Sequence, residues 1–217
     1  IKELHFFMKN IFLLIKTFFF FLVLLTNLYA EDLRDFAVGS NIELVPERGY
    51  VNLKCKNNKE IFKWSDFKNC TKNSDGLYIV SFEYDERFAV TEEYEGTQVS
   101  GHPVLINIAI DDTGILQEIN INTDPNVPFY FRKQSHLLWL RVYSKYGGQN
   151  WACIDKDMKD GHIKIGKKYM NRVCTKEVGN KLITIESHFY FVGEKNNRDN
   201  LVSKSFLQIK FNGKVSI

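Results

Sequence analysis

The sequence predicts an α+β fold, in which a mainly antiparallel sheet is packed on one face by a single main helix and is held by two disulfides. Several segments alternate apolar and polar residues with a period of two, as half-buried strands do. One stretch in the middle of the chain changes to helical spacing and ends at Gly147-Gly148. Strands therefore precede and follow one helix, an order that favours α+β over repeated strand–helix units.

The beginning of the chain has the pattern of a secretory signal peptide. We expect translation to start at Met8, which is followed by the positive residue Lys9. The uninterrupted apolar core, Phe18 to Leu25, suits a signal peptide and is too short to span a bilayer of about 30 Å by itself. Ala30 supplies a small residue at the cleavage position, and Glu31 begins a polar segment.

These signals divide the chain into two parts. Residues 1–30 contain upstream residues and the signal peptide, and residues 31–217 form a single compact exported domain. The alternative is an uncleaved membrane anchor that uses the whole stretch 11–29. Cleavage would leave the mature protein without a stable membrane anchor.

Three short elements are expected before the central hairpin. Residues 50–55 can form a short strand, and residues 61–67 a short helical turn or strand. The first clear strand is 77–84, because its aromatic and apolar side chains fall on one face. The members of that face are Tyr78, Val80, Phe82 and Tyr84.

The best hairpin signal in the chain follows at 104–121. Its turn, Asp111-Asp112-Thr113-Gly114, ends in a glycine that can supply a positive φ. Gln117 is the one polar interruption on the returning strand. The expected apolar face consists of Val104, Ile106, Ile108, Ile110, Ile115, Ile119 and Ile121.

Helical spacing begins after the hairpin. Residues 128–146 contain no turn residue, and 124–126 offer capping residues in front of them. The residues that recur at helical spacing are Phe131, Ser135, Leu138, Val142 and Tyr146. We expect this helix to lie across the apolar face of the hairpin, with Leu138 and Val142 as the central contacts, because each apolar surface needs the other to leave water.

The last third of the chain predicts more strands. A short strand at 151–154 is followed by a charged loop, 155–168, and the chain closes with strands 182–192 and 201–211. On the first of these closing strands Ile183, Ile185, Phe189 and Phe191 alternate with Thr184, Glu186, His188 and Tyr190. Glu186, His188 and Tyr190 form a candidate binding surface on the outer face, and a solvated sheet face is the alternative.

Four cysteines, Cys55, Cys70, Cys153 and Cys174, allow three disulfide pairings. Proximity favours Cys55–Cys70 and Cys153–Cys174, because short loops close at a lower entropy cost. Disulfides are the expected state of an exported protein. Neither pair has the Cys-x-x-Cys spacing of a zinc site.

Motifs that carry chemistry are absent from the sequence. The acidic run from Asp155 fails the spacing of a calcium loop, because Lys159 and Gly166 occupy positions that need oxygen ligands. The histidines show no His-Glu-x-x-His pattern; they are His5, His102, His136, His162 and His188. Serine-hydrolase and phosphate-loop motifs are also missing. The sequence therefore predicts no catalytic residue, no cofactor and no metal.

Several segments of the chain resemble those of a known protein family. They are the hairpin with its Asp-Asp-Thr-Gly turn, the helix, Tyr146-Gly147, Trp151-Ala152-Cys153, and Trp64–Phe67 before Cys70. On these segments the chain resembles an uncharacterised family of small exported proteobacterial proteins over most of its mature part. That resemblance implies export and paired cysteines but no activity. The hairpin and helix also look like the C-terminal domain of TonB-type energy transducers, but the chain lacks their long proline-rich spacer.

The composition and net charge of the chain bear on which classes of protein and partner it fits. Hydrophobic residues make up 44% of the chain and charged residues 25%, which is ordinary for a globular protein. Residues 1–30 contain three of the 29 basic and one of the 26 acidic residues, so the remaining 26 basic and 25 acidic residues give a net charge of +1. Nothing in this balance favours nucleic acid as a partner.

The sequence therefore predicts an exported protein, periplasmic or secreted, that is not an enzyme and binds another macromolecule, such as an unknown protein partner. Two alternatives stay open. One is a periplasmic hydrolase with an unrecognised active site, and the other is a secreted effector of a host-associated bacterium.

The signal-peptide interpretation predicts that the mature chain begins at Glu31. N-terminal sequencing of the exported protein measures this directly. Recovery of an exported product that still contains residue 20 would show that the signal is not cleaved.

Overall fold

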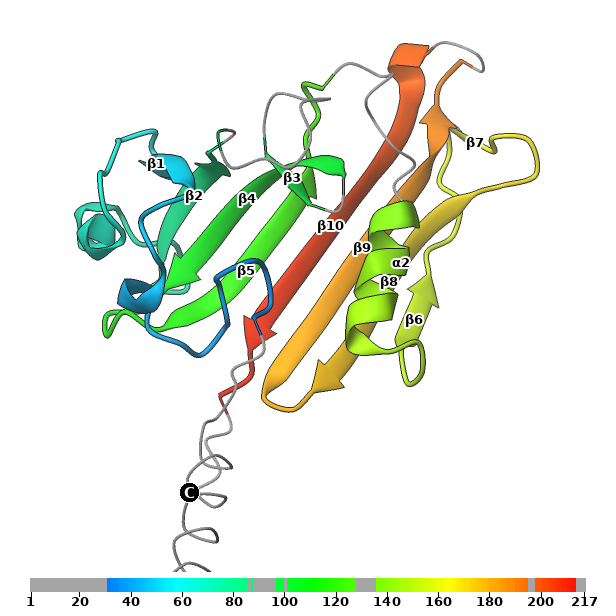
Figure 1. Ribbon diagram of the computed structural model, residues 1–217. Coiled ribbons are helices and arrows are strands. Elements are labelled where there is room, and N and C mark those ends of the chain that lie inside the picture. Colours follow the sequence, from blue (N-terminus) through cyan, green and yellow to red (C-terminus); the bar gives the residue numbers. More distant parts are fainter. Residues whose placement is uncertain are drawn as a thin grey trace, which may run out of the picture. The chain divides into compact units, whose positions relative to one another are not determined.

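Ten strands in one antiparallel sheet dominate the structure, a computed structural model (Figure 1). It describes residues 31–85, 87, 97–99, 101–127, 136–194 and 198–213. The predicted signal peptide and the first part of the predicted helix, 128–135, lie outside these residues.

The strands are β1 (Tyr50–Cys55), β2 (Tyr78–Tyr84), β3 (Gln98–Val99), β4 (His102–Ile110), β5 (Leu116–Thr123), β6 (Ala152–Asp155), β7 (His162–Ile163), β8 (Met170–Val178), β9 (Lys181–Val192) and β10 (Leu201–Phe211). The helical elements are the 3₁₀ turns η1 (Ile42–Leu44), η2 (Trp64–Asn69) and η5 (Arg198–Asn200), and the α-helix α2 (His136–Tyr146). The predicted α+β class, with its antiparallel sheet, one main helix and two disulfides, is confirmed.

The sheet has the strand order β1-β2-β4-β5-β10-β9-β8-β6, with β3 paired to β4 and β7 paired to β9. The C-terminal strand β10 lies between β5 and β9, so it joins the strands before α2 to the strands after it (Figure 1). The two halves of the chain therefore share one continuous sheet and one apolar face.

A single row of side chains shows how continuous that face is. Val80 of β2 lies opposite Ile108, Ile108 opposite Ile119, Ile119 opposite Ile209, and Ile209 opposite Ile183 of β9. Each of these five side chains is at most 1% exposed. Cross-strand apolar pairs of this kind are the unit of sheet stabilisation, and here they connect five neighbouring strands.

The segment before β1 covers the β2–β4–β5 part of this face. Phe36 is fully buried and stacks on Phe82 of β2, with 4.9 Å between ring centroids. Trp64 of η2 meets Phe36 edge to face at 5.4 Å. The Gly39 amide donates to the carbonyl of Leu116 in β5, which fixes the segment along the sheet. The predicted element at 61–67 is thus a helical turn that belongs to this cover.

The predicted partner of the helix is wrong. Leu138 and Val142 are buried, as expected, at 1% and 4% exposure. Helix α2 packs mainly on β9 and β10. Of the β4–β5 hairpin, Ile121 borders the same small cavity as Leu138 and Val142. The physical reason is that the segment around Phe36 already covers the hairpin face.

The expected register of the hairpin is also wrong at one position. A bulge between Ala109 and Ile110 places Leu116 opposite Ile110. Leu116 is fully buried, and Ile115, the residue expected on this face, is only partly buried. Because of this bulge, the buried residue opposite Ile110 is Leu116 instead of its neighbour Ile115.

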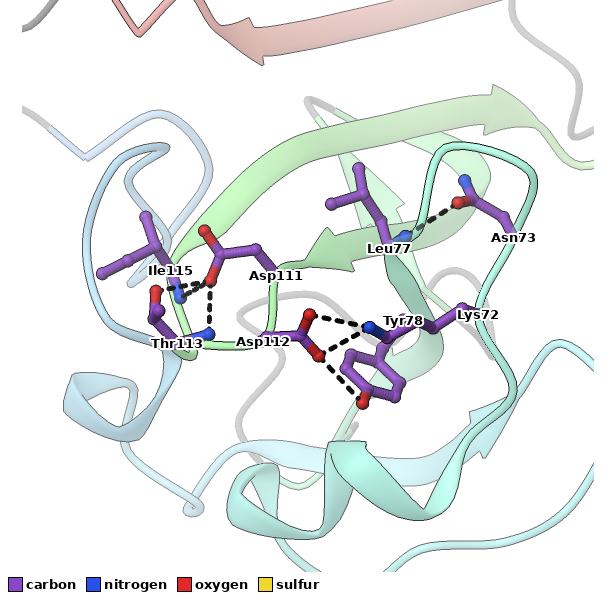
Figure 2. Close-up of polar contacts among 8 residues, drawn as sticks. All are labelled: Lys72, Asn73, Leu77, Tyr78, Asp111, Asp112, Thr113 and Ile115. Carbon is purple, nitrogen blue, oxygen red and sulfur yellow. Dashed lines mark hydrogen bonds and ion pairs between the residues drawn. The ribbon is translucent and has the colours of Figure 1, made fainter.

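The predicted turn at Asp111–Gly114 is confirmed, and Gly114 has a φ of 86°. The Asp111 carboxylate accepts from the amides of Thr113 and Ile115 at 2.8 and 3.0 Å (Figure 2). Asp112 accepts from the ammonium of Lys72 at 2.7 Å. These hydrogen bonds of the Asp111 and Asp112 carboxylates stabilise the turn between β4 and β5.

Both predicted disulfides are confirmed, with Cα separations of 5.2 Å for Cys55–Cys70 and 4.0 Å for Cys153–Cys174. The second pair joins directly opposed residues of β6 and β8. Disulfides of this kind are consistent with an oxidising compartment outside the cytoplasm. No helix in the described part of the chain has the length and hydropathy needed to cross a membrane.

Asp32 connects the N-terminal cover to both other layers. Its carboxylate accepts from the Lys181 ammonium of β9 at 2.7 and 2.8 Å, from the Val38 amide at 2.9 Å and from the Tyr146 hydroxyl of α2 at 3.2 Å. Its side chain is 1% exposed. Burial and the Asp32 charge raise the pKa of Tyr146, so this hydroxyl remains a donor.

We expect the substitution Leu138→Ala to lower the free energy of unfolding by about 2–5 kcal/mol, because it removes a buried side chain between α2 and the sheet. Glu186→Ala, on the opposite face of β9, is expected to have little effect. Thermal melts of both variants measure the difference. Equal melting temperatures would contradict the burial of the α2 face.

The substitution Asp32→Ala removes the buried carboxylate that Lys181 and Val38 contact, so we expect a loss of about 3–5 kcal/mol in stability. The matched control is Asp112→Ala, which removes an exposed carboxylate that also contacts a lysine and should leave stability nearly unchanged. Urea denaturation of the two variants gives the comparison. Coincident unfolding curves would show that Asp32 does not connect the layers.

Candidate functional site

The predicted binding surface lies on the face of β9 that points away from α2. Glu186, His188 and Tyr190 follow one another at every second residue of this strand. The Glu186 carboxylate is 3.4 Å from His188 Nε2 and 3.9 Å from Lys156 Nζ. Burial lowers the pKa of His188, with Glu186 acting in the opposite direction.

The charged loop between β6 and β8 covers one end of this surface. His162 of β7 stacks on Tyr190 with 4.1 Å between ring centroids, and Tyr190 is only 8% exposed. The Tyr169 hydroxyl lies 3.0 Å from His162 Nδ1. The rings of His162 and His188 thus both lie near the Tyr190 ring, at 4.1 and 6.4 Å between centroids, which their sequence spacing did not indicate. Whether this surface binds a partner stays a prediction.

A larger hollow lies on the other face of the sheet, beside α2. It is a cavity of about 600 Å³ between α2, the loop before β8, and strands β8 and β9. Figure 1 shows α2 alongside these strands. Its described lining residues are Trp139, Leu140, Ile165, Lys167, Lys168, Tyr169, Met170, Arg172, Ser187 and Phe189. Small-molecule sites typically have volumes of about 300–1,000 Å³.

The sheet provides two rows of this lining. Met170 of β8 lies opposite Phe189 of β9, and Arg172 lies opposite Ser187. Directly opposed residues of an antiparallel pair share one face of the sheet. The cavity wall therefore has an apolar row and a polar row next to it.

Two buried polar groups in the lining have no hydrogen-bond partner in the described part of the chain. They are the Ser187 hydroxyl and the Trp139 indole Nε1. Ser187 is 3% exposed. Buried polar groups in proteins are nearly always hydrogen-bonded, but both atoms lie below the cavity surface, where a molecule in the cavity does not reach them. Unpartnered Tyr84 Oη and Asn171 Oδ1 are also buried, but their residues do not line this cavity.

The charged side chains among the described lining residues are all cationic. Arg172 donates from Nε and Nη2 to the Asp155 carboxylate at 2.6 and 2.8 Å, which lowers the pKa of Asp155 and holds the guanidinium in place. Lys167 and Lys168 are exposed on the loop before β8. Among the described lining residues, most are therefore apolar or aromatic, and the charged ones are positive.

Sequence reasoning missed this site for two reasons. Strand β8 has mixed polar and apolar residues on both faces, so no alternation revealed it. Ser187 was a usable signal, because it is the one polar residue between Ile185 and Phe189 on the buried face of β9. A lone serine in a row of apolar residues marks a position where a polar group is buried.

Among the described residues, no group of three or more histidine, cysteine, aspartate or glutamate side chains is arranged to hold a metal ion.

Comparison with known proteins gives no assignment, because no protein-family model, no curated protein and no solved structure matches this chain. Membership of the exported proteobacterial family stays a prediction.

Proposed function

We propose that this protein is an exported binding protein, acting in the periplasm or outside the cell, and that the cavity beside α2 holds an apolar or amphipathic small molecule. One observation carries the proposal: the cavity has the size of a small-molecule site, and most of its described lining residues are apolar or aromatic. The predicted signal peptide and the two disulfides support the exported location. Binding of another macromolecule stays a prediction for the Glu186, His188 and Tyr190 face.

The energetic argument favours an occupied cavity. An empty apolar cavity loses dispersion contacts at its wall. A ligand that fills the space restores those contacts. The apolar side chains Leu140, Ile165, Met170 and Phe189 supply the contact area for it.

The test uses N-phenylnaphthylamine, an uncharged dye that fluoresces in apolar sites, with the purified exported protein. We expect saturable binding at one site. Met170→Trp enlarges a side chain in the cavity wall and should weaken dye binding about tenfold or more, equivalent to ~1.4 kcal/mol. Met158→Trp makes the same change at an exposed position outside the cavity and should have no effect. Dye binding that is absent, or equal in both variants, would contradict the proposal.

A further inference from the structure

We infer that this protein forms a two-fold symmetric dimer, in which β6 of one copy pairs antiparallel with β6 of a second copy and the two Ile154 residues lie opposite each other. The inference does not depend on the ligand of the cavity beside α2. Its basis is the edge of the sheet that β6 forms (Figure 1), which offers unpaired backbone groups and an exposed isoleucine.

The two edges of the sheet differ in what covers them. Strand β1 forms one edge and β6 the other. At the β1 edge the chain returns along the strand: the Cys55 amide donates to the Lys59 carbonyl at 2.8 Å, and the Ile61 amide donates to the Leu53 carbonyl at 3.0 Å. At the β6 edge all of Ala152–Asp155 is exposed, and no described strand pairs with its outer side. An edge of this kind can accept a further strand.

The backbone groups of Cys153 and Asp155 point to the open side of β6. The Lys156 amide donates to the Asn171 carbonyl at 2.7 Å, on the β8 side. Residues of an antiparallel pair alternate between hydrogen-bonded and non-hydrogen-bonded positions, so Asp155 and Cys153 occupy the non-hydrogen-bonded ones. The Cα separation of 4.0 Å between Cys153 and Cys174 agrees, because non-hydrogen-bonded pairs are the closer ones. Every second residue of β6 therefore has an amide and a carbonyl at the edge that no described residue binds.

Strand β6 lacks the features that usually keep a sheet edge from pairing. Natural edges carry proline, bulges or charged side chains. The sequence of β6 contains no proline, and its register with β8 is continuous. Its one charged residue, Asp155, is bound by Arg172 at 2.6 Å. The edge is therefore open to a strand whose side chains fit it.

The side chains of β6 fit a second copy of the same strand. A two-fold axis through an antiparallel pair places one residue opposite its own copy. Asp155 at this position would oppose two like charges, and Cys153 would set Ile154 against the small Ala152. With Ile154 at the axis, Cys153 of one copy and Asp155 of the other exchange both of their N–H···O bonds. No like charges of β6 are then directly opposed.

The same register gives Ile154 an apolar partner. Ile154 is 69% exposed and lies opposite Val173 of β8, on the sheet face that also carries Glu186. At a non-hydrogen-bonded position the two Ile154 Cα atoms would lie about 4.5 Å apart. Ile154 and Val173 of both copies then form one apolar cluster across the axis. The occupant that this edge fits is therefore a second copy of the chain.

Sedimentation velocity of the exported protein, at concentrations from about 5 to 500 µM, tests for the dimer. We expect reversible dimerisation with a dissociation constant on the order of 10–100 µM, because a contact through one short strand belongs to the small interfaces. A protein that stays monomeric over this range would overturn the inference and leave a strand of another protein as the occupant of the edge.

Charge variants at one position test the register. Ile154→Lys and Ile154→Glu each remove the apolar contact and oppose like charges across the axis, so each variant alone should dimerise about tenfold or more weakly. An equimolar mixture of the two should dimerise again, because opposite charges then face each other. Absence of this recovery would contradict the pairing of Ile154 with its own copy.

The control is Phe62→Lys, which introduces the same charge at an 85% exposed apolar residue next to the covered β1 edge. It should leave dimerisation unchanged, because it lies at the other edge of the sheet. Dimerisation that Phe62→Lys weakens as much as Ile154→Lys would identify unspecific association of apolar side chains and overturn the inference.

Hydrogen exchange measured by NMR supplies a readout of the backbone. The amides of Cys153 and Asp155 should exchange more slowly as the dimer forms, because they gain acceptors only in the dimer. The Ile154 amide faces β8 in both states and should change little. A dimer whose formation leaves exchange at Cys153 and Asp155 unchanged would be formed through another surface, which would overturn the inference.

Discussion

The structure depends on covering one apolar sheet face that is wider than any single helix. Eight strands lie side by side in the main path of the sheet, and at about 4.8 Å per strand they span roughly 34 Å. A helix with its side chains is only about 10–12 Å across. Two covers are therefore needed, and the chain uses the segment around Phe36 for β2, β4 and β5, and α2 for β9 and β10.

The width of the sheet also explains the location of the cavity. Helix α2 covers β9 and β10, and the part of β8 and β9 beyond it is only partly covered by the loop before β8. Ser187 and Trp139 lie at this boundary with buried polar atoms that no protein group satisfies. The cavity is thus a consequence of the way the sheet is covered.

Local signals in the sequence predicted local structure well. Strands 50–55 and 201–211 have the expected bounds, Gly114 forms the expected turn, and short loop closure gave both disulfide pairs. The predictions were wrong where segments that are distant in sequence compete for the same face of the sheet. The helix was assigned to the hairpin because they are neighbours in sequence, but residues 39–42 of the N-terminal cover bind the hairpin at Gly114 and Leu116. The bulge that buries Leu116 depends on pairing geometry, and the cavity requires four separate segments to meet.

The most direct test follows the indole N–H signals in a ¹H–¹⁵N spectrum of the exported protein during titration with N-phenylnaphthylamine. The chain has three tryptophans; Trp64 and Trp151 Nε1 already donate to backbone carbonyls, and Trp139 Nε1 has no partner in the described part of the chain. The Trp139 indole signal should shift when the aromatic dye enters the cavity that Trp139 lines, with the Trp64 signal nearly unchanged. A Trp139 signal that stays in place at saturating dye would contradict the assignment of this cavity as a ligand-binding site.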